Sequence, residues 1–138
     1  MAERMLADTN VLIRFLTGEP PALAQRARAL VASADAGDVD LVVLPLIVAE
    51  TVYTLESYYK MNAPIIVAKL TAFLQSRGVV AEDENLVLEA LKRHGSKNIH
   101  FADAYLAACA VERSMPVVSF DRDFSKFDDI RWIEPKGR

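Results

Sequence analysis

Asp40-Leu41-Val42-Val43-Leu44-Pro45 is the stretch that decides the fold. Its first five residues form a continuous β-type run, which is typical of a strand covered on both faces. Pro45 suits the first turn of a helix, which we expect to reach about Tyr59. A covered strand followed at once by a helix is the repeating unit of a parallel sheet with helices on both faces.

Strand and helix signals alternate in the same way along the rest of the chain. The expected strands are Arg4–Ala7, Asp40–Leu44, Val79-Val80, Val117–Phe120 and Ile130–Ile133. The expected helices are Thr9–Leu16, Ala22–Ala34, Pro45–Tyr59, Ala63–Ser76, Glu84–Arg93 ended by Gly95, and a helix capped by Ser96 or Asn98 that runs to about Ser114. The alternation predicts an α/β fold, and residues 1–138 have the usual length of a single domain.

Composition sets broad limits on function. The chain is 52% hydrophobic and 25% charged, which is enough apolar material for an ordered core. Its net charge of −3 gives no broad basic surface, although acidic enzymes act on RNA when metal ions offset the phosphate charge. Cys109 has no partner for an internal disulfide, and no signal peptide or membrane-spanning run is visible. We therefore expect a soluble, cytoplasmic protein.

Four carboxylates lie inside or at the end of apolar segments: Asp8, Glu50, Asp103 and Asp121. Asp8 and Asp121 directly follow predicted strands, and Glu50 lies in the first turns of the helix after another strand. Because parallel sheets bind ligands at the carboxyl ends of their strands, we expect these three to converge on one sheet edge. Asp103 interrupts an almost wholly apolar helix of the kind that is normally buried. Acids in such settings, without matching lysines or arginines nearby, predict a divalent cation.

Simpler roles remain open for several of these acids. Asp8 stands where it could cap the helix that begins at Thr9. Glu50 points away from the apolar stripe of its helix, as a solvated surface glutamate does. Asp121 and Asp123 share a polar loop in which Asp123 could pair with Arg122 or Lys126. Asp121 is the better candidate because it is nearer the strand end.

Other catalytic arrangements find little support. His94 and His100 lack the spacing of a metal-binding pair, and we expect them in a loop and at a helix start. No serine has a convincing histidine partner, so a nucleophilic triad is disfavoured. Neither GxGxxG nor a Walker A sequence is present, which disfavours a nucleotide loop.

Four short motifs resemble those of PIN-domain proteins, in the family order and over nearly the whole chain. Ala7-Asp8-Thr9-Asn10-Val11-Leu12 resembles the opening signature. Pro45-Leu46-Ile47-Val48-Ala49-Glu50 places a second acid after a strand, and the segment 101–108 resembles the helix that carries the third. Val118-Ser119-Phe120-Asp121-Arg122-Asp123-Phe124 is similar to the closing segment with the fourth.

Among PIN proteins, a single domain of this length most resembles the VapC toxins of toxin–antitoxin pairs. The resemblance implies a three-layer α/β/α sandwich with a central, mainly parallel sheet. It implies a metal-dependent endoribonuclease that acts on RNA, forms a homodimer and is neutralised by a VapB-type antitoxin. The implied catalytic and metal-binding residues are Asp8, Glu50, Asp103 and Asp121.

The donor set is composed of hard oxygen ligands, without a cysteine or histidine cluster. Such ligands suit one or two Mg²⁺ or Mn²⁺ ions better than zinc. Asp8 and Asp103 are the first choices for direct ligands, while Glu50 and Asp121 would ligate directly, ligate through water or orient the attacking water. The residues expected to support these carboxylates are Thr9, Asn10, Ser119 and Asp123.

Two other functions stay open at this point. A haloacid-dehalogenase-like phosphatase also places Asp after a first parallel strand, but it normally needs a second acid two residues later, where this chain has Asn10. A non-catalytic acidic α/β module that binds a partner protein is the other alternative, and the intact set of four acids argues against it.

Overall fold

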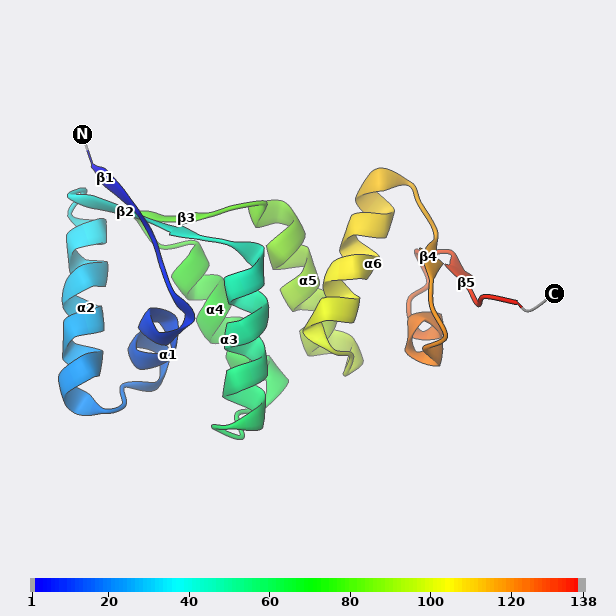
Figure 1. The fold of residues 1–138 in the computed structure, drawn as a ribbon, viewed down its shortest axis with the longest axis horizontal. Coiled ribbons are helices and arrows are strands. Elements are labelled where there is room, and N and C mark those ends of the chain that lie inside the picture. Colours follow the sequence, from blue (N-terminus) through cyan, green and yellow to red (C-terminus); the bar gives the residue numbers. More distant parts are fainter. Residues whose placement is uncertain (1, 137–138) are drawn as a thin grey trace.

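Parallel strands and helices alternate in the computed structural model, which describes residues 2–136 (Figure 1). The strands are β1 (Glu3–Leu6), β2 (Val39–Val43), β3 (Val79–Ala81), β4 (Val117–Val118) and β5 (Trp132–Ile133). The helices are α1 (Thr9–Thr17), α2 (Pro21–Asp35), α3 (Pro45–Ser57), α4 (Ala63–Leu74), α5 (Glu84–Lys97) and α6 (Phe101–Arg113), with a short 3-10 helix η1 (Arg122–Lys126). The predicted α/β class with parallel strand pairing is confirmed.

Local sequence signals explain most of the helix boundaries. Pro21 and Pro45 stand in the first turns of α2 and α3, where a missing N–H group costs nothing. Gly18 ends α1 in the left-handed conformation that glycine adopts readily. Between residues 2 and 136, none of the helices is both long and apolar enough to cross a bilayer.

The junction between α5 and α6 differs from the sequence prediction. Gly95 does not end α5, because close packing against α4 favours glycine inside the helix: a Cβ at this position would lie 3.1 Å from Val67 Cγ2. Asn98 ends α5 in the left-handed conformation instead of capping α6. His94, which the sequence placed in a loop, is buried in α5, where its Nδ1 contacts the carbonyl oxygen of Ile99. His100 precedes α6, as predicted.

The strands form two separate sheets. In the first, β2 lies between β1 and β3, and both pairings are parallel. In the second, β4 pairs in parallel with β5. Figure 1 shows the β4–β5 pair beyond α6, far from β1. The expectation that Asp121 joins Asp8 and Glu50 at one edge of a single sheet is therefore wrong for this conformation.

The segment from α6 to β5 forms a unit with its own core, which we call the C-terminal unit (residues 101–133). Its α6 packs mainly on α5 and more lightly on α3. Phe124 and Phe127 fill a small core against α6 and β4, which also includes Ile99. This separate packing explains why β4 lies away from the first sheet. The core beside that sheet is built from residues of β2, α1, α3, α4 and α5, together with Ala7 and Phe101.

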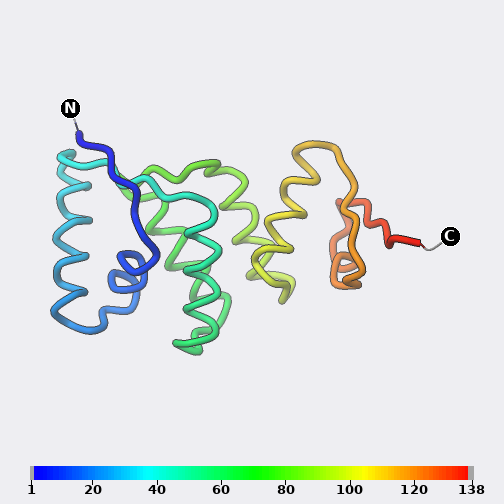
Figure 2. Tube along the Cα trace, in the orientation of Figure 1, coloured from blue at the N-terminus to red at the C-terminus, as the bar shows by residue number. Residues whose placement is uncertain are grey.

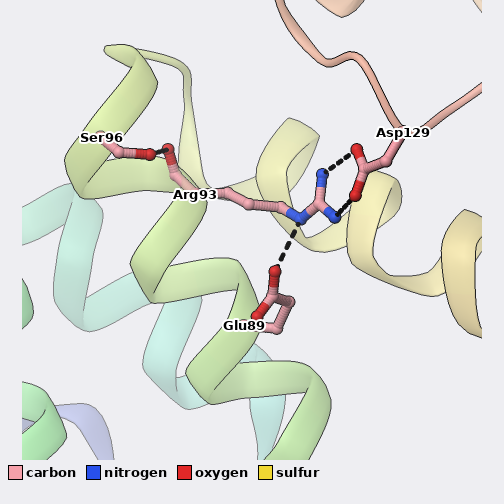
Figure 3. A network of polar contacts seen from close by, with 4 residues as sticks. All are labelled: Glu89, Arg93, Ser96 and Asp129. Atoms are coloured by element: carbon pink, nitrogen blue, oxygen red, sulfur yellow. Dashed lines mark hydrogen bonds and ion pairs between the residues drawn. The ribbon is translucent and has the colours of Figure 1, made fainter.

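Arg93 of α5 fastens the C-terminal unit to the rest of the chain (Figure 3). Its guanidinium donates to both carboxylate oxygens of Asp129, with Nη1 to Oδ1 at 2.9 Å. Its Nε lies 3.3 Å from Glu89 Oε1, close enough for an ion pair but without hydrogen-bond alignment. The guanidinium carbon also stands 5.2 Å from the centre of the Phe127 ring. Charge pairing and stacking thus hold this unit in place.

The Arg93–Asp129 pair makes stability depend on acid pH. Hydrogen bonding to Arg93 holds the pKa of Asp129 below its usual value, against the opposing effect of burial. A lowered carboxyl pKa adds stability above the unfolded-state value, and this is lost as pH falls through the folded-state value. We expect Asp129→Asn to lower the free energy of unfolding at pH 7 by about 1 kcal/mol, since Asp129 is half exposed. Denaturant titration of wild type and variant at pH 7 and pH 3 measures this.

Asp128→Asn is the matched control, since Asp128 is exposed and adjacent. It should leave stability unchanged at both pH values. Equal unfolding free energies for wild type and Asp129→Asn at pH 7 would contradict the role given to this pair.

Candidate active site

The first group of candidate residues lies where β1 ends and α1 begins. Asp8 occupies the N-cap position of α1, but its exposed side chain makes no capping hydrogen bond. Thr9 is buried, and its Oγ1 donates to Oε1 of Glu50 on α3. That bond joins the start of α1 to α3. It holds the exposed Glu50 close to the end of β1, where Asp8 lies. Helix capping therefore does not account for the Asp8 carboxylate, which stays free for a ligand.

The second group lies between α6 and η1. Asp103, in the first turn of α6, is half-buried. Burial and the negative charge of Asp121 raise the pKa of Asp103, with Asp123 adding to the rise and His100 opposing it. Three acids therefore share one region, where Asp121 and Asp123 both repel Asp103.

Local bonds orient the acids that follow β4. Asp121 Oδ1 accepts from the backbone N–H of Asp123 at 2.8 Å, which caps η1. The Oγ of Ser119 accepts from the backbone N–H of Asp121 at 2.9 Å. Asp123 pairs with Lys126 at 3.3 Å, one of the local roles anticipated from the sequence. Ser119 thus orders the chain around Asp121 and does not bond to its carboxylate.

A cavity of about 310 Å³ adjoins the second group, between α3 and the start of α6. Its lining includes Tyr53 and Glu56 from α3, and His100 and Asp103 from the other side. Neither Tyr53 nor Glu56 was predicted from the sequence as a site residue. Tyr53 follows Glu50 by three positions, which places both on one side of α3 and is the signal that could have identified it.

The two groups stay apart in this conformation. Across residues 2–136, no three acidic, histidine or cysteine side chains lie close enough together to hold a metal ion. The carboxylate chemistry of both groups suits Mg²⁺ or Mn²⁺. Neither group alone provides a complete ligand set, because Asp8 and Glu50 belong to one and Asp103, Asp121 and Asp123 to the other.

Comparison with known proteins places this chain in a family. The model of the PIN domain matches residues 5–130, a span that includes both groups of acids. The chain belongs to the PIN-domain family. A segment of 33 residues is 52% identical to Ribonuclease VapC37 of Mycobacterium tuberculosis, and it covers 24% of this chain and 23% of that protein.

Among solved structures, the chain is similar to one described as VapBC2 from Rickettsia felis bound to a DNA fragment from their promoter. That match covers 96% of this chain and 98% of the other, at 16% identity and a TM-score of 0.36.

Proposed function

We propose that this protein is a metal-dependent endoribonuclease and the toxin of a VapBC-type toxin–antitoxin pair. It hydrolyses RNA phosphodiester bonds in the cytoplasm with Asp8, Glu50, Asp103 and Asp121. The PIN-domain match over residues 5–130, which spans all four acids, carries this proposal. The likeness of one segment to Ribonuclease VapC37 supports RNA as the substrate class.

The four carboxylates would hold Mg²⁺ or Mn²⁺, with Asp8 and Asp103 as direct ligands. A bound divalent ion supplies positive charge that offsets the scissile phosphate and the leaving oxygen. Thr9 keeps one oxygen of Glu50 in a fixed direction, so the other oxygen is free for a ligand or water. The repulsion of Asp103 by Asp121 and Asp123 would be relieved by a bound cation, which supports a metal in this region.

Cleavage of labelled structured RNA by antitoxin-free protein tests this function. We expect cleavage with Mg²⁺ or Mn²⁺ and none in EDTA, because the carboxylates repel the phosphate unless a cation lies between them. Restoring the metal should restore the activity. Cleavage that persists at full rate in EDTA would exclude the proposed chemistry.

Thr9→Val tests the bond that orients Glu50. The substitution keeps the shape of the side chain and removes its hydroxyl, so Glu50 loses the donor that fixes it. We expect RNA cleavage to fall by roughly 10- to 100-fold, the usual effect of losing a partner of a metal-site carboxylate. The measurement is the initial rate at saturating Mg²⁺.

Thr51→Val provides the control for this substitution. Thr51 is also buried, but its hydroxyl donates to the carbonyl of Ile47 within its own helix and not to a carboxylate. It should leave cleavage near the wild-type rate. Equal losses in the two variants would show that a buried threonine matters for stability and not for Glu50.

A further inference from the structure

Within residues 2–136, no strand pairs with the edge of β1 that faces away from β2. Glu3 and Ala7 donate their N–H groups toward β2, to the carbonyls of Asp38 and Val42. Because backbone groups alternate in direction along a strand, those of Leu6 face the free edge. The Leu6 side chain is 71% exposed. Unpaired edges with apolar side chains are templates for pairing with another strand.

The edge of β4 that faces away from β5 is free in the same way. Val117 and Ser119 donate their N–H groups to the carbonyls of Arg131 and Ile133 on the β5 side. The backbone groups of Val118 therefore face the free edge, and its side chain is 61% exposed. Each of the two sheets thus ends in a strand that is paired on one edge only.

Apolar side chains also remain uncovered on one face of each sheet. The register places Leu6, Val42 and Val80 on the same face of the first sheet, where Val80 is 37% exposed and Val42, on the central strand, is buried. In the second sheet Val118 lies beside Ile133, which is 41% exposed. The first sheet and the second sheet therefore both present apolar side chains beside a free edge, and both are parallel.

We infer that the C-terminal unit of a second copy docks on β1, with its β4 pairing in parallel with β1. The C-terminal unit of each copy would pair with β1 of the other copy. The result is a two-fold dimer with exchanged strands. The strand that pairs with β1 comes from a second copy, because within one chain the C-terminal unit is held away from β1. Arg93, Asp129 and Phe127 fasten it beyond α6, and Figure 2 shows β4 and β5 at the opposite end of the molecule from β1.

The exchange would complete the active site, and this consequence rests on the proposed function. Parallel pairing places the carboxyl ends of β1 and β4 at the same sheet edge. Asp8 stands two residues after the end of β1 at that edge, and Asp121 stands three residues after the end of β4. Asp8 and Glu50 of one copy would then meet Asp103 and Asp121 of the other. The dimer would contain two such sites, each with the carboxylates that one copy divides between its units.

Cross-linking tests the pairing without any need for activity. We would introduce Leu6→Cys and Val118→Cys together in the full chain, with Cys109→Ala to remove the native thiol. A short bis-maleimide should convert this variant into a covalent dimer, whereas Leu6→Cys alone stays a single chain. A link inside one chain, or the absence of any link, would overturn the inference.

Mixing two inactive variants tests the shared site. The Asp8→Asn and Asp103→Asn variants are refolded together in equal amounts. Half of the resulting dimers then contain one copy of each variant, and each mixed dimer has one intact site out of two. We expect about one quarter of the wild-type cleavage rate, whereas each variant alone gives none. No recovery, with an active wild type, would overturn the shared site. An inactive wild type would refute the proposed nuclease, and the cross-link would still decide the exchange.

Discussion

Asp103→Asn should reduce the rate of RNA cleavage by at least about 100-fold. Losing a residue that only supports a metal ligand costs up to about 100-fold, and losing a direct ligand should cost at least as much. The substitution replaces a charged oxygen ligand with a neutral amide and keeps the side-chain shape. It also removes the charge that Asp121 and Asp123 repel. Single-turnover cleavage of labelled RNA in Mg²⁺ is the measurement.

The fold should survive this substitution. Burial and neighbouring charge raise the pKa of Asp103, so its ionised form costs stability at every pH above the unfolded-state pKa. The neutral amide avoids that cost, and the melting temperature should not fall. Asp38→Asn is the control, because Asp38 is an exposed acid in the turn before β2. Cleavage by Asp103→Asn at the rate of this control would exclude Asp103 from the site.

Strong local signals predicted most of the secondary structure. The apolar run before Pro45 defined β2 and the start of α3 to within one residue, because buried strands and first-turn prolines have few alternatives. Asp8 was predicted just before a helix that begins at Thr9, and it occupies the N-cap position of α1. These features depend on neighbours in sequence, which a single chain displays directly.

Features that depend on distant contacts were harder to predict. Gly95 is a helix breaker by propensity, yet it lies inside α5, where a Cβ would stand only 3.1 Å from Val67 Cγ2 of α4. The position of β4 depends on packing around Arg93 and Phe127, which no local pattern reveals. The bond from Thr9 to Glu50 spans 41 positions and was expected only as general support for the carboxylates.

Gly78→Ala should destabilise the first sheet severely. Gly78 has a φ of +81°, and a Cβ there would stand 2.1 Å from the carbonyl oxygen of Ala34 in α2. The backbone fixes the position of the Cβ, and the carbonyl oxygen is itself part of the backbone. Therefore β3 or α2 must move. The Gly78 carbonyl also accepts from Leu41 N–H at 2.7 Å, which ties it to the central strand β2. We expect a loss of at least about 3 kcal/mol in the free energy of unfolding, measured by urea denaturation.

Gly37→Ala separates the clash from the backbone strain. Gly37 has a similar φ of +90°, but a Cβ there would have nothing within 4 Å. This variant therefore carries only the cost of a left-handed alanine, about 1–2 kcal/mol. The excess loss in Gly78→Ala then measures the contact between α2 and the start of β3. Equal losses in both variants would mean that the sheet shifts freely at Gly78 and that Ala34 does not fix the position of β3.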